Sequence, residues 1–114
     1  VNVVDTPHLC NCIVPSVVDR KPLTIAISTS GVSPALAKTI RLELEKQYGP
    51  EVSLYLRSVR RLRSEAQKTV PDKRKREKFL KEIASKDILG ILRDKGAGAA
   101  IGVAKGRLDK AKKT

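Results

Sequence analysis

The chain has 114 residues and a formal net charge of +12, from 24 lysines and arginines against 12 acidic residues. Cys10 and Cys12 are too close in sequence for a disulfide framework and favour a reducing compartment, and no apolar run is long enough to cross a bilayer. Two tyrosines, one phenylalanine and no tryptophan leave little material for base stacking, and the lack of methionine, even at position 1, leads us to expect a fragment.

The first third of the sequence predicts short strands. Residues 2–4 form a β-branched run that ends at Asp5, so we expect a strand presenting this carboxylate at its C-terminal end. Two further strands are predicted at 14–18 and 23–28, joined by residues 19–22 in a hairpin. Because two strands alone are marginal in water, this hairpin needs a sheet, a helix or a second copy to cover it.

A helix follows the second strand of the hairpin. Ser33 is typical of a helix N-cap, and Pro34 suits the first helical position. An apolar residue recurs at every fourth position until the dipeptide 49–50 (Gly-Pro) stops the helix, where we place a domain boundary. The expected stripe consists of Leu36, Ile40, Leu44 and Tyr48.

Residues 50–95 predict three packed helices. In the first helix, one face is apolar and the opposite face is basic. The apolar face holds Val52, Tyr55, Leu56, Val59, Leu62, Ala66 and Val70, and the basic face holds Arg57, Arg60, Arg61, Ser64 and Lys68. The next two helices carry Phe79, Leu80, Ile83, Ile88, Leu89, Ile91 and Leu92. Residues 96–114 are rich in glycine and alanine, and we expect a tail or linker there.

The stretch TIAISTSGVSPAL (24–36) runs from a strand through a turn of hydroxyls and glycine into a helix start. Such a turn can hold an anion, because the first backbone N–H groups of a helix have no internal partner. It lacks the Gly-Lys-Ser/Thr of a nucleotide P-loop. Two interpretations therefore stay open: a site for acidic groups, or hydroxyls that only cap the helix.

Two further groups of residues are candidate sites. Asp5 is placed as a general base or transient metal ligand, or it only makes a turn before Thr-Pro. His8, Cys10 and Cys12 lack a fourth ligand, which argues against structural zinc.

Positive charge is concentrated in the second half. Residues 1–50 carry five lysines and arginines against four acids, and residues 51–114 carry nineteen against eight. The basic helix face and the run 73–76 are either a solvated surface or an attractor for nucleic acid or a poly-acidic metabolite.

The strings VNVVDTPHLCN and VPSVVDRKPLTIAISTSGVSPALAKTIRLELE resemble the precorrin-2 dehydrogenase/ferrochelatase module of the siroheme synthase family. The similarity is continuous over residues 1–45 and weaker to residue 96. It implies an α+β fold: residues 1–5 as the last strand of a truncated Rossmann domain, 6–49 as a strand-and-helix dimerisation region, and 50–95 as a small three-helix domain.

This resemblance implies NAD-dependent oxidation of precorrin-2 to sirohydrochlorin and, in many members, insertion of ferrous iron to give siroheme. We therefore expect a tetrapyrrole polycarboxylate as substrate, a homodimer, a cytoplasmic location, and no membrane or nucleic-acid partner. NAD would be bound by the missing N-terminal domain, so the fragment itself would be inactive. The alternative is a small basic nucleic-acid-binding domain without catalysis.

The resemblance also assigns roles to residues. Asp5 corresponds to the family's important aspartate, which is expected to act as a general base and to hold the incoming metal briefly, with His8 as a second catalytic candidate that assists it. Substrate-binding candidates are Ser28, Thr29, Ser30, Gly31, Ser33, Arg57 and Arg61. Thr29 stands where bifunctional bacterial members have a phosphorylatable serine, and Cys12 stands where an aromatic residue is common.

Overall fold

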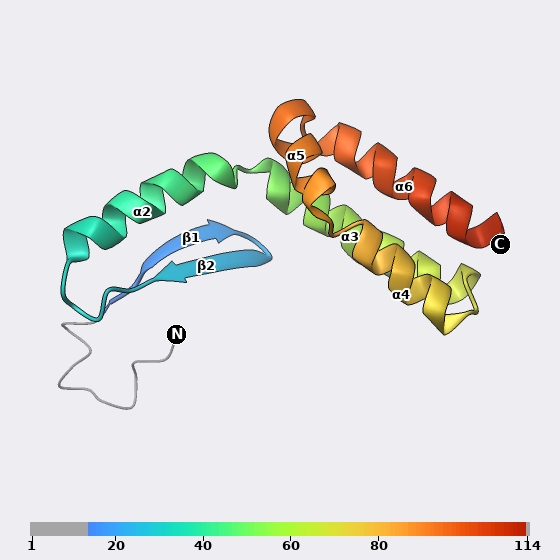
Figure 1. Ribbon diagram of the computed structural model, residues 1–114, viewed down its shortest axis with the longest axis horizontal. Coiled ribbons are helices and arrows are strands. Elements are labelled where there is room, and N and C mark those ends of the chain that lie inside the picture. Colours follow the sequence, from blue (N-terminus) through green and yellow to red (C-terminus); the bar gives the residue numbers. More distant parts are fainter. Residues whose placement is uncertain (1–13, 114) are drawn as a thin grey trace. The chain divides into compact units, whose positions relative to one another are not determined.

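The structure, a computed structural model, describes residues 14–113. It divides the chain into two compact units at the Gly49–Pro50 junction. The first unit holds a two-stranded sheet and one helix, and the second holds only helices (Figure 1). This composition confirms the α+β class. The predicted strand at residues 2–4, with Asp5, His8, Cys10 and Cys12, lies outside the described residues.

The hairpin of the first unit consists of β1 (Ser16–Arg20) and β2 (Leu23–Ile27), which pair antiparallel. The register runs from Ser16 opposite Ile27 to Arg20 opposite Leu23. The first strand therefore lies two residues later than predicted, because residues 21–22 alone make the turn. The Asp19 carboxylate helps to close this turn by accepting a hydrogen bond of 3.1 Å from the Lys21 N–H.

Helix α2 (Pro34–Gln47) covers one face of the hairpin. Its N-cap is Ser33, as predicted, with Pro34 at the first helical position. Ala37 is buried against the sheet, where Val18 is fully buried. The prediction that Leu36 belongs to this packed stripe is wrong: the residue is 53% exposed. The other residues of the predicted stripe, Ile40, Leu44 and Tyr48, are half-buried. A four-residue spacing drifts around the helix, which leaves Leu36 outside the covered face.

A cation at the C-terminal end of α2 joins the helix to the hairpin. Arg20 donates hydrogen bonds from Nε to the Tyr48 carbonyl (2.7 Å) and from Nη2 to the Glu45 carbonyl (3.3 Å). These are carbonyls of the last helical turn, which have no partner within the helix. A positive charge there is also favoured by the helix dipole. Arg20, expected in the turn, is therefore the residue that fixes α2 to β1.

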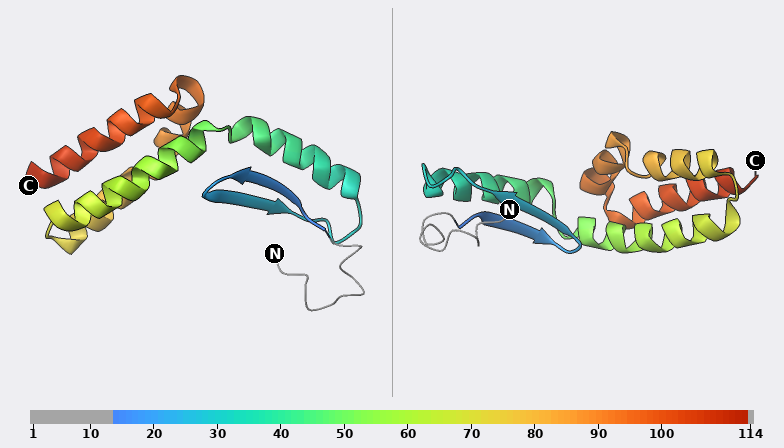
Figure 2. Two further views of the ribbon diagram at one scale, coloured as in Figure 1. Left: turned by 180° about the vertical axis from the view of Figure 1, so that it is seen from behind. Right: turned by 90° about the horizontal axis from the view of Figure 1, so that it is seen from below.

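The second unit contains four helices, α3 (Glu51–Thr69), α4 (Lys73–Glu82), α5 (Lys86–Lys95) and α6 (Ala97–Lys113). The three helices predicted for residues 50–95 are present as α3, α4 and α5. The prediction of a tail or linker at 96–114 is wrong, because α6 occupies this segment. In both views of Figure 2, α6 lies along α3. Ala100, Ala104 and Leu108 repeat every fourth residue and are at most 1% exposed, so this alanine-rich segment is an amphipathic helix whose small side chains allow close packing.

The core of this unit is formed by the predicted apolar face of α3 together with residues from the other three helices. The basic face predicted opposite it is exposed throughout, from Arg57 to Lys68. The core side chains are Tyr55, Leu62, Ala66, Val70, Phe79, Ile83, Ile88, Leu92, Ala100, Ala104 and Leu108.

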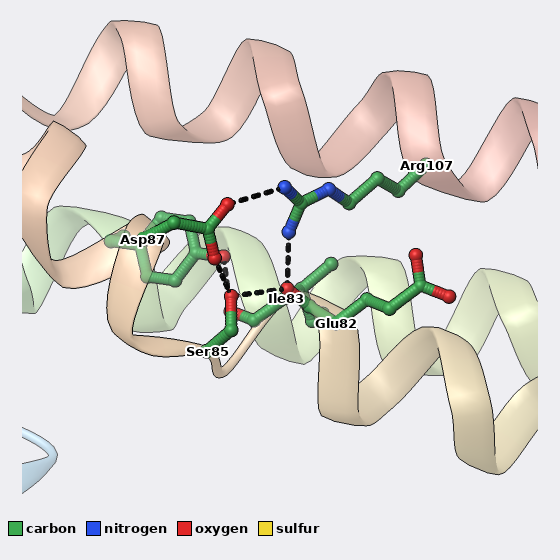
Figure 3. A network of polar contacts seen from close by, with 6 residues as sticks. Glu82, Ile83, Ser85, Asp87 and Arg107 are labelled. Carbon is green, nitrogen blue, oxygen red and sulfur yellow. Dashed lines mark hydrogen bonds and ion pairs between the residues drawn. The ribbon is translucent and has the colours of Figure 1, made fainter.

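Polar contacts fix α6 to the corner between α4 and α5 (Figure 3). Arg107 of α6 donates hydrogen bonds to the Asp87 carboxylate (2.6 Å) and to the Glu82 carbonyl. The Ser85 hydroxyl is also hydrogen-bonded to Asp87, and together with Arg107 it holds the pKa of that carboxyl below its usual range. Beneath them, the Tyr55 hydroxyl donates to the Ile83 carbonyl at 2.5 Å.

Candidate functional site

The hydroxyl-rich turn between β2 and α2 is held together by its own side chains. The Ser28 hydroxyl accepts a hydrogen bond from the Ser30 N–H (3.1 Å), and the Thr29 hydroxyl accepts one from the Ser33 N–H (2.9 Å). The Ser33 hydroxyl in turn accepts from the Leu36 N–H (3.1 Å). Each of these predicted site residues therefore has a structural role at the start of α2.

The backbone of this turn is not a phosphate cradle. Ser30 and Gly31 have φ values of 55° and 81°, which turn the chain sharply and suit glycine at the second position. The Val32 N–H donates to the Thr29 carbonyl (3.1 Å), so the N–H groups of Ser30, Val32 and Ser33 are all used within the turn. An anion would need those groups free.

The hydroxyl groups of the same turn, unlike its backbone N–H groups, can still donate hydrogen bonds to a ligand. A hydroxyl that accepts a backbone hydrogen bond keeps its own hydrogen, which it can donate to a ligand oxygen. Ser28 is exposed, and Thr29 and Ser33 are half-buried. The hollow beside them has a volume of about 20 Å³, which is about the space of one water molecule. Within its own unit, the turn is thus a rim of donors rather than an enclosing pocket.

The predicted arginines lie in the helical unit. Arg57 and Arg61 are both exposed on α3. Arg61 borders a groove of about 510 Å³ between α3 and α6, and Arg57 is not among the residues that line it. Besides Arg61, the charged side chains of the groove are Arg60, Glu65, Lys68 and Lys105.

Lys105 is a groove residue that the sequence reading missed, because its segment was assigned to a tail. The signal that would have placed it is the four-residue spacing of Ala100, Ala104 and Leu108. This spacing makes residues 97–113 helical and puts Lys105 beside the buried face.

A metal or a dinucleotide bound by residues 14–113 would need specific features there. No group of three or more His, Cys, Asp or Glu side chains gathers in this part of the chain. A dinucleotide needs a glycine-rich turn with free N–H groups at a helix start, and those of the turn before α2 are occupied. The turn before α2 is therefore not a dinucleotide-binding turn. None of the helices in the described part is long and apolar enough to cross a membrane.

Comparisons with known proteins point to one family. The family model described as "Sirohaem biosynthesis protein central" matches residues 20–47, which run from the end of β1 through α2. A siroheme synthase of Azotobacter vinelandii is 39% identical over 83 residues, covering 73% of this chain and 18% of that protein. One from Ruthia magnifica is 60% identical over 45 residues, covering 40% of this chain and 10% of that protein.

The similarity is not confined to the hairpin and α2. A siroheme synthase of Pseudomonas aeruginosa aligns over 124 positions with 35% identity, covering 95% of this chain and 26% of that protein. The chain thus spans about a quarter or less of the length of these three relatives. Since the matched region takes in the turn, the capped helix and the helical unit, the chain belongs to the siroheme synthase family.

Proposed function

We propose that this chain is the central and helical part of a siroheme biosynthesis enzyme that binds a tetrapyrrole polycarboxylate. In this proposal the enzyme oxidises precorrin-2 to sirohydrochlorin with NAD as hydride acceptor, and inserts ferrous iron as a second reaction. The family membership supports the pathway. The chemistry is assigned to residues outside 14–113, with Asp5 as the predicted general base and NAD bound by another part of the enzyme.

The observation that carries the proposal is the set of hydroxyl donors at the turn. A tetrapyrrole of this pathway presents many carboxylates around a flat ring, so its site needs donors that point outward from a rigid edge. Ser28, Thr29 and Ser33 are fixed by the hydrogen bonds they accept from the backbone. Their remaining hydrogens suit carboxylate oxygens, and hydrogen bonds to charged groups are the stronger class.

The described residues have few of the features with which proteins bind nucleic acids. Tyr55 and Phe79, the aromatic residues of the basic helical unit, are 4% and 2% exposed, so neither ring is available to stack on a base. The remaining aromatic residue, Tyr48, is half-buried in the first unit, which carries little of the net positive charge. The basic surface alone would attract a phosphate backbone without reading it. The nucleic-acid alternative therefore rests on charge only, and we prefer the metabolite.

We also propose that the first unit forms a homodimer. Most of the large apolar side chains exposed in residues 14–113 belong to this unit, and the β1–β2 hairpin has α2 on one face only. On the open face Val17 is paired with Ala26. A second copy packed on the open face would cover Val17 and Ala26 and would protect the strand edges. The large apolar side chains exposed in this unit are Val14, Val17, Val32, Leu36 and Leu42.

Titration with sirohydrochlorin, followed by its absorption spectrum, tests the role of the turn. Thr29→Val keeps the shape of the side chain but loses its hydroxyl, and Thr29→Ser keeps the hydroxyl. A hydrogen bond to a carboxylate is worth about 1.5 kcal/mol at the low end, so Thr29→Val should bind roughly tenfold more weakly. Thr29→Ser should bind like the parent protein. Circular dichroism would check that both variants keep α2.

Two results would contradict the proposal. One is equal affinity of the Thr29→Val and Thr29→Ser variants for sirohydrochlorin. The other is absence of sirohydrochlorin binding together with tight, salt-sensitive binding of duplex DNA, which would favour the basic nucleic-acid-binding alternative. The catalytic prediction is tested separately in the full-length enzyme, where Asp5→Ala should be assayed for the oxidation and for iron insertion.

A further inference from the structure

The groove between α3 and α6 gathers cations that form no ion pair within residues 14–113. Arg60, Arg61, Lys68 and Lys105 line it, and within residues 14–113 their charged groups take part in none of the ion pairs, which join Arg41 to Glu45, Arg107 to Asp87, and Lys112 to Glu65. Like charges held together without compensation repel one another. An anion in the groove would relieve this repulsion.

The remaining polar side chains of the groove do not prevent an anion from binding there. Glu65 is the single acid in the lining, and Lys112 lies 3.4 Å from its carboxylate, so part of its charge is already compensated. Ser58 is the buried polar residue of the described chain, at 8% exposed, and it lines the groove. Its hydroxyl makes no hydrogen bond to another side chain in residues 14–113 and remains available to a ligand.

The spacing of the cations indicates what kind of anion fits. Arg61 and Lys68 are seven residues apart on α3, which is two helical turns and about 10 Å along the axis. Lys105 comes from α6, which lies alongside (Figure 2). Along α3, Glu65 therefore lies between Arg61 and Lys68. A small single anion would reach only one end, whereas a rigid ligand with separated acidic groups would reach both.

A second cavity in the same unit serves as a comparison. It has a volume of about 370 Å³ and lies between α4 and α6, with Lys78, Glu82, Arg107 and Lys110 in its lining. Arg107 is already bound to Asp87 and to the Glu82 carbonyl. The lysines Lys78 and Lys110 take part in none of the ion pairs of residues 14–113, and Lys75 also lines the cavity. The cavity therefore has a charge similar to that of the α3–α6 groove in a smaller volume, with one of its cations already engaged, and it serves as a control of matched charge.

We propose that the α3–α6 groove binds two or more carboxylates of one rigid polycarboxylate, an inference that rests on the proposed function and names the surface that receives part of its ligand. Phosphate of a nucleic acid is the other polyanion to consider. A continuous phosphate backbone would place charge beside Glu65, whose carboxylate is only partly compensated by Lys112, whereas separated carboxylates can leave that position empty. The groove volume of about 510 Å³ is also in the range of small-molecule sites.

The test measures binding of uroporphyrin, a rigid octacarboxylate, to the 114-residue chain by fluorescence. The groove variant is Lys68→Gln/Lys105→Gln, and the matched control with the same change of charge is Lys78→Gln/Lys110→Gln. An exposed cation contributes a few-fold in affinity, so the groove variant should bind about tenfold more weakly and the control within twofold of the parent. Uroporphyrin octamethyl ester, which has the same ring without the charges, should not distinguish the three proteins.

Equal weakening in the groove variant and the control would overturn the proposal, since it would show attraction by net charge alone. No binding of uroporphyrin by the parent chain would overturn it as well, as would a 12-base-pair DNA duplex that binds more tightly than uroporphyrin and loses affinity in the groove variant. If the groove variant binds like the parent while Thr29→Val weakens sirohydrochlorin binding, the groove assignment fails and the proposed function stands. If neither substitution matters, both fail.

Discussion

The glycines of α6 allow a sharp test of the helix that replaces the expected tail. Gly102 and Gly106 lie in the interior of α6, and a methyl group added at either position would have no heavy atom within 4 Å. Glycine in a helix interior costs about 0.5–1 kcal/mol relative to alanine, because more backbone freedom is lost on folding. The double substitution Gly102→Ala/Gly106→Ala should therefore stabilise the helical unit by about 1–2 kcal/mol.

A third glycine supplies the control with the opposite sign. Gly96 lies between α5 and α6 with φ 92° and ψ 178°, a conformation that is essentially restricted to glycine. Alanine there has open space around its methyl group but strains the backbone by about 1–3 kcal/mol. Gly96→Ala should therefore destabilise the unit, although it adds the same methyl group as the other two substitutions.

The assay is thermal unfolding followed by circular dichroism at 222 nm. A change of 1 kcal/mol moves Tm by about 4–8 °C in a domain of this size, so the double variant should melt about 5–15 °C higher and Gly96→Ala lower. An unchanged Tm for the double variant would refute the packed α6, because a linker gains nothing from alanine. A lower Tm would show that the glycine face is covered and not open.

Three further predictions concern contacts outside α6. Arg20→Gln should destabilise the first unit by about 1–3 kcal/mol, because the carbonyls at the end of α2 lose a charged donor; urea denaturation measures this, and an unchanged midpoint would contradict it. Burial raises the pKa of Tyr55 from 10.0 to about 12. As the pH rises, the unfolded chain therefore loses this proton before the folded chain does. The contribution of Tyr55 to the free energy of unfolding should be fully present below pH 10 and should be lost between pH 10 and 12, and Tyr55→Phe should abolish this pH dependence. Val17→Asp should convert a dimer into a monomer in sedimentation equilibrium, while Thr24→Asp at a polar position of the same face should perturb it less.

The parts of the fold that were predictable are those in which local chemistry and packing agree. Ser33 and Pro34 mark the start of α2 whatever lies nearby, because capping needs only the residue's own side chain and the next turn of backbone. The face of α3 was equally clear, since seven apolar positions over five turns leave one solution. These elements did not depend on knowing a partner.

The errors arose where small residues or long side chains act through tertiary contacts. The glycines and alanines of residues 96–114 led us to predict a linker, yet alanine has the highest helix propensity and packs closely. The buried positions of α6 are defined by its packing against α3. Arg20 looked like a turn residue, because nothing in the sequence shows that its guanidinium meets carbonyls of α2. Leu36 was placed one position from the covered face, since a four-residue spacing drifts around the helix.

The two candidate surfaces, the turn of the first unit and the groove of the second, carry different kinds of donor. One experiment can therefore separate their contributions. Hydroxyls of the turn act at short range and are fixed by the backbone, whereas the groove cations are exposed and their attraction is screened by salt. Loss of Lys68 and Lys105 should therefore flatten the dependence of uroporphyrin affinity on salt concentration. Loss of the Thr29 hydroxyl should lower the affinity at every salt concentration and leave the slope unchanged. Parallel slopes for both variants would mean that the groove contributes no electrostatic attraction to the ligand.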